Sequence, residues 1–534
     1  MKKKLRIILA SIFLASTLMG CSANAANDEN TNAENGENSN SASVNISASS
    51  EEPTALQHSD EISLKSPKYV FLFIGDGMSF PQFQSASDYL GALADADYMQ
   101  AVPSLEDNGG AVLDGPIPLN FMGFDAVGSV FNYDSNSFAP DSSSSATSIA
   151  TGHKTYSGSL NVDETAATKY ETIAEKLHKQ LGMKVGIVTS VNVNHATPAA
   201  FYAHQANRRN YYDIGLELID SDFEYFAGGG LLTPTGNDGN KEDLYTLAQN
   251  AGYNVVKTHA EAEQVSEGPV IIIDENLADF NTMAYELDRT EDMWSLSDYV
   301  KKGIEVLDND KGFFIMCEGS KIDWACHAND AAAAIHDTLA LADAVQTAID
   351  FAKEHADETL ILVTGDHETG GLSIGFAGTN YDTYFSLLEN QKISFAKYDS
   401  DYVSSYKENK TSFEDVLKDV ENLFGLKADG DPKDKLVLTD YELGLLRTAY
   451  NKSVNETDTG MAEQEEYVAY GTYEPLSVTL THVLNNKAGI SFSSYSHSGL
   501  PVAVFAKGLN AKEFNGYYDN TEIFKKLANM LGVK

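Results

Sequence analysis

The chain has 534 residues and carries 78 acidic against 37 basic side chains, which gives a formal net charge of −41 at pH 7. Such an acidic surface repels nucleic acid and anionic membranes, and this argues against a nucleic-acid partner. A phosphorylated substrate would be repelled as well, unless metal ions or arginine supplied local positive charge.

The first 20 residues have the pattern of an export signal. Four basic residues between positions 2 and 6 precede a short apolar segment at 7–14, and Leu18-Met19-Gly20 leads directly into Cys21. This tetrapeptide resembles the lipobox of bacterial lipoproteins, in which the cysteine is lipidated after cleavage; the alternative is a plain signal peptide with an incidental cysteine. No later run reaches the ~18 apolar residues of a membrane span. We expect an exported protein, held to a bacterial membrane only through a lipid on Cys21 and located in the periplasm or at the cell surface.

Residues 21–66 are rich in Asn, Ser, Glu and Ala and contain almost no large apolar side chains. Such a segment cannot bury enough surface to offset the entropy of ordering, so we predict a disordered tether. Residues 67–534 are predicted to form one large domain, because apolar strand-like runs are spread over its whole length. Cys317 and Cys326 are too few for a disulfide framework and are expected to be separate buried thiols.

Short apolar runs alternate with amphipathic segments along this domain. The runs lie at residues 68–74, 184–189, 270–273, 312–317, 359–364 and 501–505, and the segments at 171–181 and 338–353 have helical spacing. This alternation is typical of an α/β fold with a mainly parallel central sheet flanked by helices on both faces. Ligands in such folds bind beyond the carboxyl ends of the strands.

Acidic residues and histidines gather at those strand ends. They are Asp76 after the first run, Glu318, Asp323 and His327 after the fourth, Asp366 and His367 after the fifth, and His497 before the last. Mixed carboxylate and imidazole sets suit Zn²⁺, whereas sets of oxygen atoms alone suit Mg²⁺. Because seven such groups would be unfavourable together without cations, the pattern predicts two or more metal ions. For a single segment such as 321–327, a buried ion pair is an equally good interpretation.

The stretch from Asp141 to Gly152 joins an acidic residue, four serines and a short helix-compatible segment. It places a serine at the N-terminus of a helix, where backbone N–H groups favour an anion. Taken alone, the stretch is equally consistent with a serine-rich surface turn.

Together these motifs resemble the alkaline phosphatase family. The matching segments are 74–78, 141–152, 195–200, 318–327, 364–367 and 497–499, and they follow the order found in the family across residues 68–534. The resemblance implies a phosphate monoester hydrolase that works at alkaline pH and forms a phosphoserine at Ser142.

The resemblance also implies a role for each site residue. One zinc ion would be held by Asp323, His327 and His497, a second by Asp76, Asp366 and His367, and a third ion, usually magnesium, by Asp76, Thr197 and Glu318. Arg208 would hold two phosphate oxygens, and Asp141 would position Arg208. The physical chemistry agrees, because a serine without a neighbouring base needs activation by metal, and a planar guanidinium suits phosphate.

Four positions depart from the best-known bacterial members of the family. His195 stands in place of an aspartate and Trp324 in place of a lysine, so the identity of the third metal is open. We expect both residues to lie behind the direct ligands. Ser143 and Ser144 replace two alanines after the nucleophile, and we expect their hydroxyls to lie at a solvated helix start.

Two long insertions interrupt the motifs, at about 211–301 and 377–487. The second resembles the crown-type insertion of the family, with helix patterns at 413–426 and after Thr439, and it implies a homodimer. Two other functions remain open at this stage. One is a related phosphodiesterase, which would lack the third ligand set, and the other is a non-catalytic binding lipoprotein, which would have lost a ligand.

Overall fold

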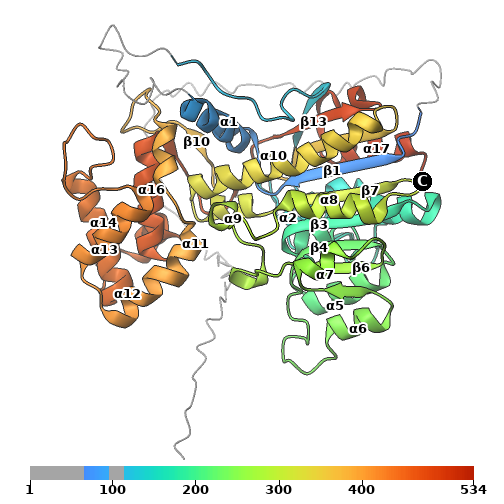
Figure 1. The fold of residues 1–534 in the computed structure, drawn as a ribbon, viewed down its shortest axis with the longest axis horizontal. Helices are drawn as coiled ribbons and strands as arrows, with labels where there is room; N and C mark the ends of the chain where they lie inside the picture. Colours follow the sequence, from blue (N-terminus) through green and yellow to red (C-terminus); the bar gives the residue numbers. More distant parts are fainter. Residues whose placement is uncertain (1–64, 95–112) are drawn as a thin grey trace, which may run out of the picture. The chain divides into compact units, whose positions relative to one another are not determined.

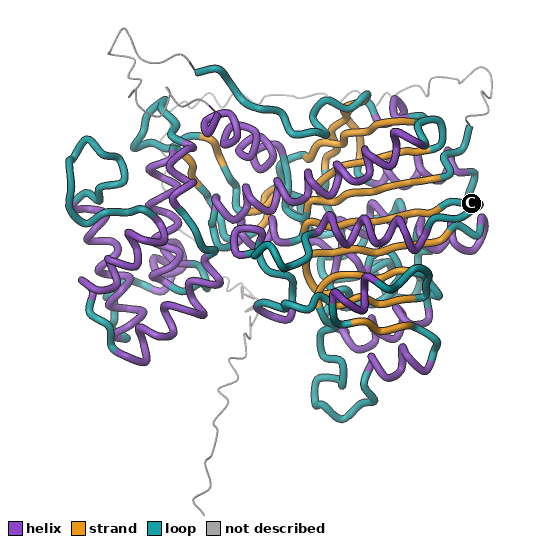
Figure 2. The backbone as a smooth tube through the Cα atoms, viewed as in Figure 1, coloured by secondary structure: helices purple, strands orange, loops and turns teal. Residues whose placement is uncertain are grey.

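A ten-stranded sheet forms the centre of the protein. The structure is a computed structural model that describes residues 65–94 and 113–534. Across the sheet the strands run in the order β14 (Gly516–Asp519), β2 (Ala126–Phe131), β13 (Val502–Gly508), β8 (Thr359–Gly365), β1 (Tyr69–Gly75), β7 (Phe313–Gly319), β3 (Lys184–Asn192), β4 (Tyr225–Gly229), β6 (Val270–Ile273) and β5 (Asn254–Val256). Figure 2 shows these strands side by side with helices packed over them.

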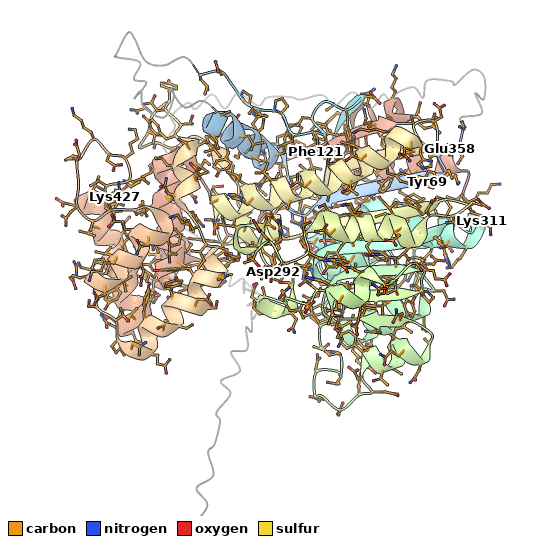
Figure 3. All side chains as sticks on the ribbon, viewed as in Figure 1. Tyr69, Phe121, Asp292, Lys311, Glu358 and Lys427 are labelled. Atoms are coloured by element: carbon orange, nitrogen blue, oxygen red, sulfur yellow. The ribbon has the colours of Figure 1, made fainter. Side chains whose placement is uncertain are left out.

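Strand β1 lies in the middle of the sheet and is buried on both faces. Phe71 and Phe73 belong to one apolar core, whereas Val70 and Leu72 belong to the core on the opposite face. This alternation follows from the two-residue period of a strand. Figure 3 labels Tyr69, where the strand begins. Parallel pairing aligns Gly75 with the last residues of β7 and β8, so three strand ends meet at one edge.

Helices cover both faces of the sheet (Figure 1). The core on one face includes side chains from α1 (Phe80–Ala94), α8 (Leu296–Leu307) and α10 (Ala331–Glu354). The core on the other face includes side chains from α2 (Ser142–Thr151), α3 (Ile173–Lys176), α5 (Tyr211–Asp220), α6 (Leu244–Asn250) and α17 (Thr521–Leu531). The predicted fold class, a mainly parallel sheet flanked by helices on both faces, is confirmed.

Some details differ from the sequence prediction. Strand β13 runs antiparallel to both of its neighbours, so the sheet is mixed at that edge. Helix α10 begins at Ala331, earlier than the predicted residue 338, because Asp330 caps a run of alanines that lacks amphipathic contrast. The predicted helix at 171–181 becomes α3 followed by a wider turn at Leu177–Leu181.

The segment between β10 (Ser373–Ile374) and β11 (Ile490–Ser491) is helical. It contains α11 (Phe395–Tyr398), α12 (Ser404–Asn409), α13 (Phe413–Phe424), α14 (Asp440–Asn455), α15 (Glu463–Tyr470) and α16 (Pro475–Ala488), drawn mainly in orange in Figure 1. The predicted capping box is confirmed, because Thr439 accepts from the backbone of Glu442 and the Glu442 side chain accepts in return. Helix α13 ends at Gly425 in a left-handed conformation, which glycine adopts without strain.

Asp330 ties this helical segment to α10. Its buried carboxylate accepts from the backbone N–H of Ala333 at 3.0 Å, from that of Phe395 at 2.9 Å, and from Gln391 Nε2 at 2.8 and 2.9 Å. We expect Asp330→Ala to lower the free energy of unfolding by about 3 kcal/mol, because several donors lose their acceptor at once. Denaturant unfolding measures this, with Asp330→Asn as the matched variant that keeps one acceptor oxygen and loses less. Equal stability of Asp330→Ala and the wild type would contradict the assignment.

The predicted export signal at 1–20, the lipidated Cys21 and the tether at 21–66 lie outside the described residues, apart from positions 65 and 66. Among the residues that the structure describes, no helix is long and apolar enough to cross a membrane. Cys317 and Cys326 are buried free thiols, as predicted.

Candidate active site

Ser142 is the first residue of α2 and follows the N-cap residue Asp141. The Asp141 carboxylate accepts from the backbone N–H of Ser144, which fixes the start of the helix. Gly152 ends the helix in the left-handed region, with a φ of 73°. The helix N-terminus therefore presents Ser142 together with free backbone N–H groups, an arrangement that favours a bound anion.

The serines after Ser142 are not at a solvated helix start, and that prediction is wrong. Ser143 and Ser144 are fully buried. Ser143 Oγ donates to Asp141 Oδ2 at 2.7 Å, and Ser144 Oγ donates to Asp141 Oδ1 at 2.8 Å and to Asp134 Oδ2 at 2.9 Å. The hydroxyl groups of this segment donate to the half-buried carboxylate of Asp141 and the buried carboxylate of Asp134, which repetition of serine in the sequence does not reveal.

Asp141 also binds Arg208, as the resemblance implied. Arg208 Nη1 donates to Asp141 Oδ2 at 2.8 Å. Burial opposes ionisation of Asp141, but the charge and hydrogen bond of Arg208 outweigh it and lower the pKa of the carboxyl. The backbone N–H of Arg208 donates to the carbonyl of Gly158 at 2.7 Å, so both ends of the residue are held.

Ser143 and Arg208 share one oxygen of Asp141, which gives Ser143 a measurable part in orienting the guanidinium. We expect Ser143→Ala to weaken competitive inhibition by inorganic phosphate by about two- to tenfold, the effect of one buried hydrogen bond. Ser148→Ala is the matched control, because Ser148 bonds only within the helix, to the carbonyl of Ser144. If both variants bind phosphate as the wild type does, Ser143 does not position Arg208.

Asp323, His327 and His497 form the first group that can hold a metal ion, since one ligand atom from each lies within 4.8 Å of the others. His327 Nε2 lies 3.2 Å from His497 Nε2 and 3.4 Å from Asp323 Oδ1. The spacing of Asp323 and His327 on α9 (Lys321–His327) places both side chains on one face of the helix, as predicted.

The protonation of the two imidazoles fits a bound cation. Nδ1 of His327 lies 2.6 Å from the carbonyl of Tyr495, and Nδ1 of His497 lies 2.6 Å from that of Pro140. Because a carbonyl only accepts, each Nδ1 carries the proton and each Nε2 is left with a lone pair. Burial and the charges of His367 and His327 hold the pKa of His497 well below its usual range. Two lone pairs facing each other are unfavourable unless a metal ion accepts both.

Asp76, Asp366 and His367 form the second group, which is wholly buried. His367 Nε2 lies 3.2 Å from Asp76 Oδ1, 3.4 Å from Asp366 Oδ2 and 3.2 Å from Ser142 Oγ. Burial and the charge of Asp76 raise the pKa of Asp366 to about 8. Burial alone would lower the pKa of His367, but the charges of Asp366 and Asp76 raise it to about 10. One nitrogen thus faces two carboxylates and the serine, as a shared cation would require.

The two groups adjoin each other. The rings of His367 and His497 stack with centroids 3.7 Å apart and planes 18° from parallel. The short pairing of β12 (His497–Ser498) with β9 (Glu368–Thr369) brings His497 to this position from the distant end of the chain. Two cations held by these groups would therefore be neighbours beside Ser142.

The third predicted set has the character of a site for a hard cation. Thr197 Oγ1 and Glu318 Oε1 are buried and form no hydrogen bond of normal geometry within the described part of the chain, and Asp76 Oδ1 is buried with His367 Nε2 3.2 Å away. Burial and the charge of Asp76 raise the pKa of Glu318 well above its usual range, and the Thr197 hydroxyl lies beside that carboxyl. Buried oxygen atoms without partners are costly, and a magnesium ion is the kind of ligand that satisfies them.

His195 and Trp324 lie at the edge of these groups. His195 caps α4 (Ala196–Ala199), the helix that carries Thr197. Burial and the charge of Arg208 lower the pKa of His195 to about 3, so the ring is neutral. Its Nδ1 is buried without a hydrogen bond, and its ring meets the edge of Trp324 with centroids 6.0 Å apart. His195 thus lies at the start of the helix that carries Thr197, and Trp324 lies directly after Asp323; a place behind direct metal ligands stays a prediction for both.

Sequence reasoning missed the side chains that support the ligands. Thr369 Oγ1 donates to Asp323 Oδ1 at 2.5 Å, and Glu368 accepts from Gln82 Nε2 at 2.8 Å and from the Ser498 hydroxyl. Gly77 has a φ of 71°, and a Cβ there would lie 2.9 Å from Asp323 Cα, so the turn after β1 needs glycine. The sequence signal that could have identified Glu368 and Thr369 as supporting residues is that they directly follow His367.

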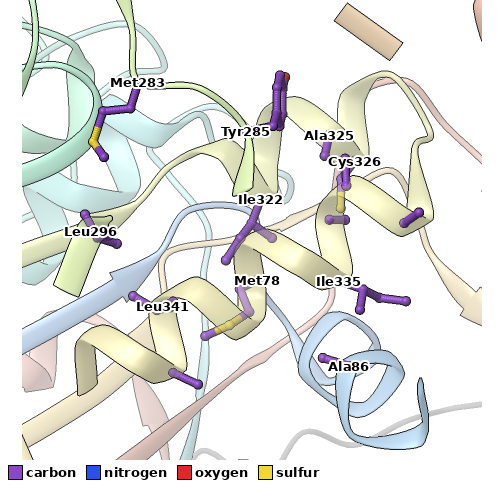
Figure 4. Close-up of a cluster of buried hydrophobic side chains, with 14 of the residues drawn as sticks. Met78, Ala86, Met283, Tyr285, Leu296, Ile322, Ala325, Cys326, Ile335 and Leu341 are labelled. Atoms are coloured by element: carbon purple, nitrogen blue, oxygen red, sulfur yellow. The ribbon is translucent and has the colours of Figure 1, made fainter. Parts of the chain in front are cut away.

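Apolar packing holds α9 against α10 and the turn after β1. Figure 4 shows Met78, Ile322, Ile335 and Leu341 in one buried cluster that joins the turn after β1 to α9 and α10. Close-packed protein interiors hold side chains in single positions. The ligands of α9 and of the β1 turn are thus set on a rigid base.

A serine at a helix N-terminus beside two carboxylate and imidazole groups, at the carboxyl edge of a parallel sheet, defines a metal-dependent hydrolase. Comparison with known proteins gives the family. The alkaline phosphatase family model matches residues 67–533, so the chain belongs to the alkaline phosphatase family. Members of this family act on phosphate monoesters, and the protein is a metal-dependent phosphomonoesterase.

Individual relatives agree with this. Alkaline phosphatase 3 of Bacillus subtilis is 29% identical over 92% of this chain and 93% of its own length. A cold-active alkaline phosphatase from Shewanella sp. is 28% identical, with a TM-score of 0.66 over 87% of this chain and 99% of that chain. The alkaline phosphatase of the Antarctic bacterium TAB5 is 25% identical, with a TM-score of 0.58 over 88% of this chain and 99% of that one.

Proposed function

We propose that the chain hydrolyses phosphate monoesters through a phosphoserine intermediate on Ser142. The observation that carries this proposal is the position of Ser142 Oγ, 3.2 Å from His367 Nε2 and so directly beside the Asp76, Asp366 and His367 group. Cations bound there supply positive charge that lowers the pKa of hydroxyl groups beside them. Ser142 attacks phosphorus, the alcohol leaves, and water then releases inorganic phosphate from the serine.

We propose that Arg208 holds two oxygens of the phosphate, since Asp141 fixes its guanidinium and the Gly158 carbonyl fixes its backbone. Planar donors match the geometry of a phosphate, and the helix N-terminus adds backbone N–H groups. These positive and dipolar groups offset the acidic surface where the substrate enters.

We propose two Zn²⁺ and one Mg²⁺ per chain. Asp323, His327 and His497 would hold one zinc ion, Asp76, Asp366 and His367 the other, and the oxygen set of Asp76, Thr197 and Glu318 the magnesium ion. The lone pairs on the first group and the unpartnered oxygens of the third set support this division. A histidine-to-glutamate variant of the TAB5 phosphatase has magnesium bound in its M3 site. This also supports a magnesium ion at the third ligand set of this chain.

We further propose activity at alkaline pH, because imidazoles and carboxylates bind metal ions only when deprotonated. Export, lipidation at Cys21, a crown-type role for residues 377–487 and a homodimer are parts of the same proposal. Together they describe a tethered phosphatase that releases phosphate outside the cytoplasm.

The rival activity is hydrolysis of diesters. The full chain, supplied with zinc and magnesium, should hydrolyse 4-nitrophenyl phosphate with a far higher kcat/KM than bis(4-nitrophenyl) phosphate. Arg208 and the third oxygen set suit a phosphate group with free oxygens, and a diester has fewer of these than a monoester. A higher kcat/KM for the diester would contradict the monoester assignment.

A further inference from the structure

The loop after β6 carries an exposed aromatic side chain in an unfavourable backbone conformation. Phe280 is 75% exposed and has a φ of 54°, and the following Asn281 has a φ of 59°. Bulky residues rarely adopt positive φ, and an exposed ring gains nothing from burial. Strain of this kind persists where surrounding contacts enforce it and is concentrated at functional sites.

Surrounding contacts do hold this loop against the ends of two strands. Asn192, the last residue of β3, donates from Nδ2 to the carbonyl of Phe280 at 3.0 Å and to that of Asn281 at 3.2 Å. The backbone N–H of Gly230 also donates to the Asn281 carbonyl, at 2.8 Å. A Cβ on Gly229 would lie 2.7 Å from the same oxygen, so glycine permits the close approach. The loop therefore passes over the end of β4 and reaches β3, toward the strands that carry the metal-binding groups.

A second set of contacts joins the loop to α9. Lys321 is fully buried, donates from Nζ to Asp279 Oδ1 at 3.1 Å, and lies 4.7 Å from the ring centroid of Trp324. The Phe280 ring meets the Trp324 ring at 87° with centroids 6.0 Å apart. Trp324 follows Asp323 directly, and its ring also contacts the ring of His195, with centroids 6.0 Å apart.

These contacts produce a row of three rings that we call the aromatic row: Phe280, Trp324 and His195. His195, whose Nδ1 is buried, is its inner end, next to the group that includes Asp76, and Phe280 is its exposed end. A phosphate ester bound at Ser142 would direct its alcohol group toward solvent. The aromatic row would offer that alcohol group an apolar surface, which begins beside the Asp76 group at His195 and ends in solvent at Phe280.

We propose that Phe280, supported by Trp324, binds the leaving group of the substrate and selects phosphate monoesters whose alcohol carries a planar aromatic ring. This inference rests on the proposed function. An aromatic leaving group gains offset or edge contacts with the exposed ring, whereas a small polyol gains almost none. Phe280 is thus a specificity-determining residue and does not contact the transferred phosphate.

The test compares 1-naphthyl phosphate with glycerol 2-phosphate on the full chain supplied with zinc and magnesium. Phe280→Ala should lower the ratio of kcat/KM for the naphthyl ester to that for the glycerol ester by roughly three- to tenfold. Phe280→Tyr should retain the ratio, because it keeps the ring. Tyr441→Ala, which removes an aromatic side chain that is also 75% exposed but lies on α14, should retain it as well. Inhibition by inorganic phosphate should be the same in all four proteins.

Other results of this comparison would overturn the role of Phe280 or the proposed function itself. An unchanged ratio in Phe280→Ala overturns the proposal, as does an equal loss on both esters together with weaker phosphate inhibition, which would mark a structural role for the loop. Phe138, 87% exposed and close to Asp141 in the chain, is the rival ring. A lower ratio in Phe138→Ala with none in Phe280→Ala would also overturn the proposal. A wild type that hydrolyses neither ester would overturn the proposed function itself.

Discussion

Ser142→Ala is expected to lower kcat for a phosphate monoester by about five orders of magnitude, as loss of a nucleophile does in enzymes that form a covalent intermediate. Ser142 Oγ is placed beside His367 Nε2 at 3.2 Å, and alanine leaves no atom there that can attack phosphorus. Both metal-binding groups should stay filled, because Ser142 belongs to neither. Steady-state kinetics on 4-nitrophenyl phosphate, with zinc and magnesium measured in the same sample, checks both statements.

Ser145 provides the matched control for that variant. Its hydroxyl is buried in the same helix and donates to Asp366 Oδ2 at 3.1 Å, so Ser145→Ala removes an equal number of atoms one turn away. Because Ser145→Ala loses one hydrogen bond to a charged partner, kcat should fall by about ten- to a hundredfold at most. Comparable turnover in Ser142→Ala and Ser145→Ala, with metal retained in both, would show that Ser142 is not the nucleophile.

Asp76→Ala is expected to lower kcat by at least about a thousandfold, more than the loss of one hydrogen-bond donor to a transition state. Asp76 is assigned to the second zinc ion and to the magnesium ion, and it lies at the end of β1 in the centre of the sheet. Its removal should therefore reduce the metal content at two positions, while zinc remains on the Asp323, His327 and His497 group. Metal analysis after dialysis, together with kinetics, gives both quantities.

Asp330→Asn separates this effect from the general cost of altering a buried carboxylate, since Asp330 lies in neither metal-binding group. That variant should retain the full metal content. A wild-type metal content in Asp76→Ala would contradict the assignment of this residue to two ions.

The sequence predicted the central strands and the groups at their ends because both follow from local rules. A continuous apolar run such as Val70–Ile74 indicates a strand buried on both faces, and parallel strands bring their carboxyl ends to one edge. The resemblance to a family then assigned Arg208 and Thr197, which carry no distinctive local pattern. Strand β2 and the edge strand β14 beside it were missed, since half of the residues of β2 face outward and weaken its apolar signal.

Residues whose role depends on tertiary packing were beyond local rules. Ser143 and Ser144 read as polar surface residues, yet each is buried against Asp141. No sequence pattern pointed to Phe280, which is exposed and whose carbonyl accepts from Asn192 at the end of β3. The partner of Phe280 lies on a part of the chain that only the fold brings near, whereas Asp141 is a local partner of the two serines and it is the fold that buries them. The antiparallel direction of β13 has the same origin, because an apolar run does not encode the direction of a strand.

The central claim, that Ser142 carries the phosphoryl group between the two chemical steps, is tested most directly by trapping the intermediate. Full-length protein with zinc and magnesium is mixed with a phosphate monoester and quenched in acid, where a phosphoserine ester is stable, and the phosphorylated peptide is located by mass spectrometry. The account predicts phosphate on Ser142 in the wild type and on no serine of α2 in Ser142→Ala. Phosphate on Ser143, Ser144 or Ser145 instead, or turnover without any phosphorylated peptide, would contradict it.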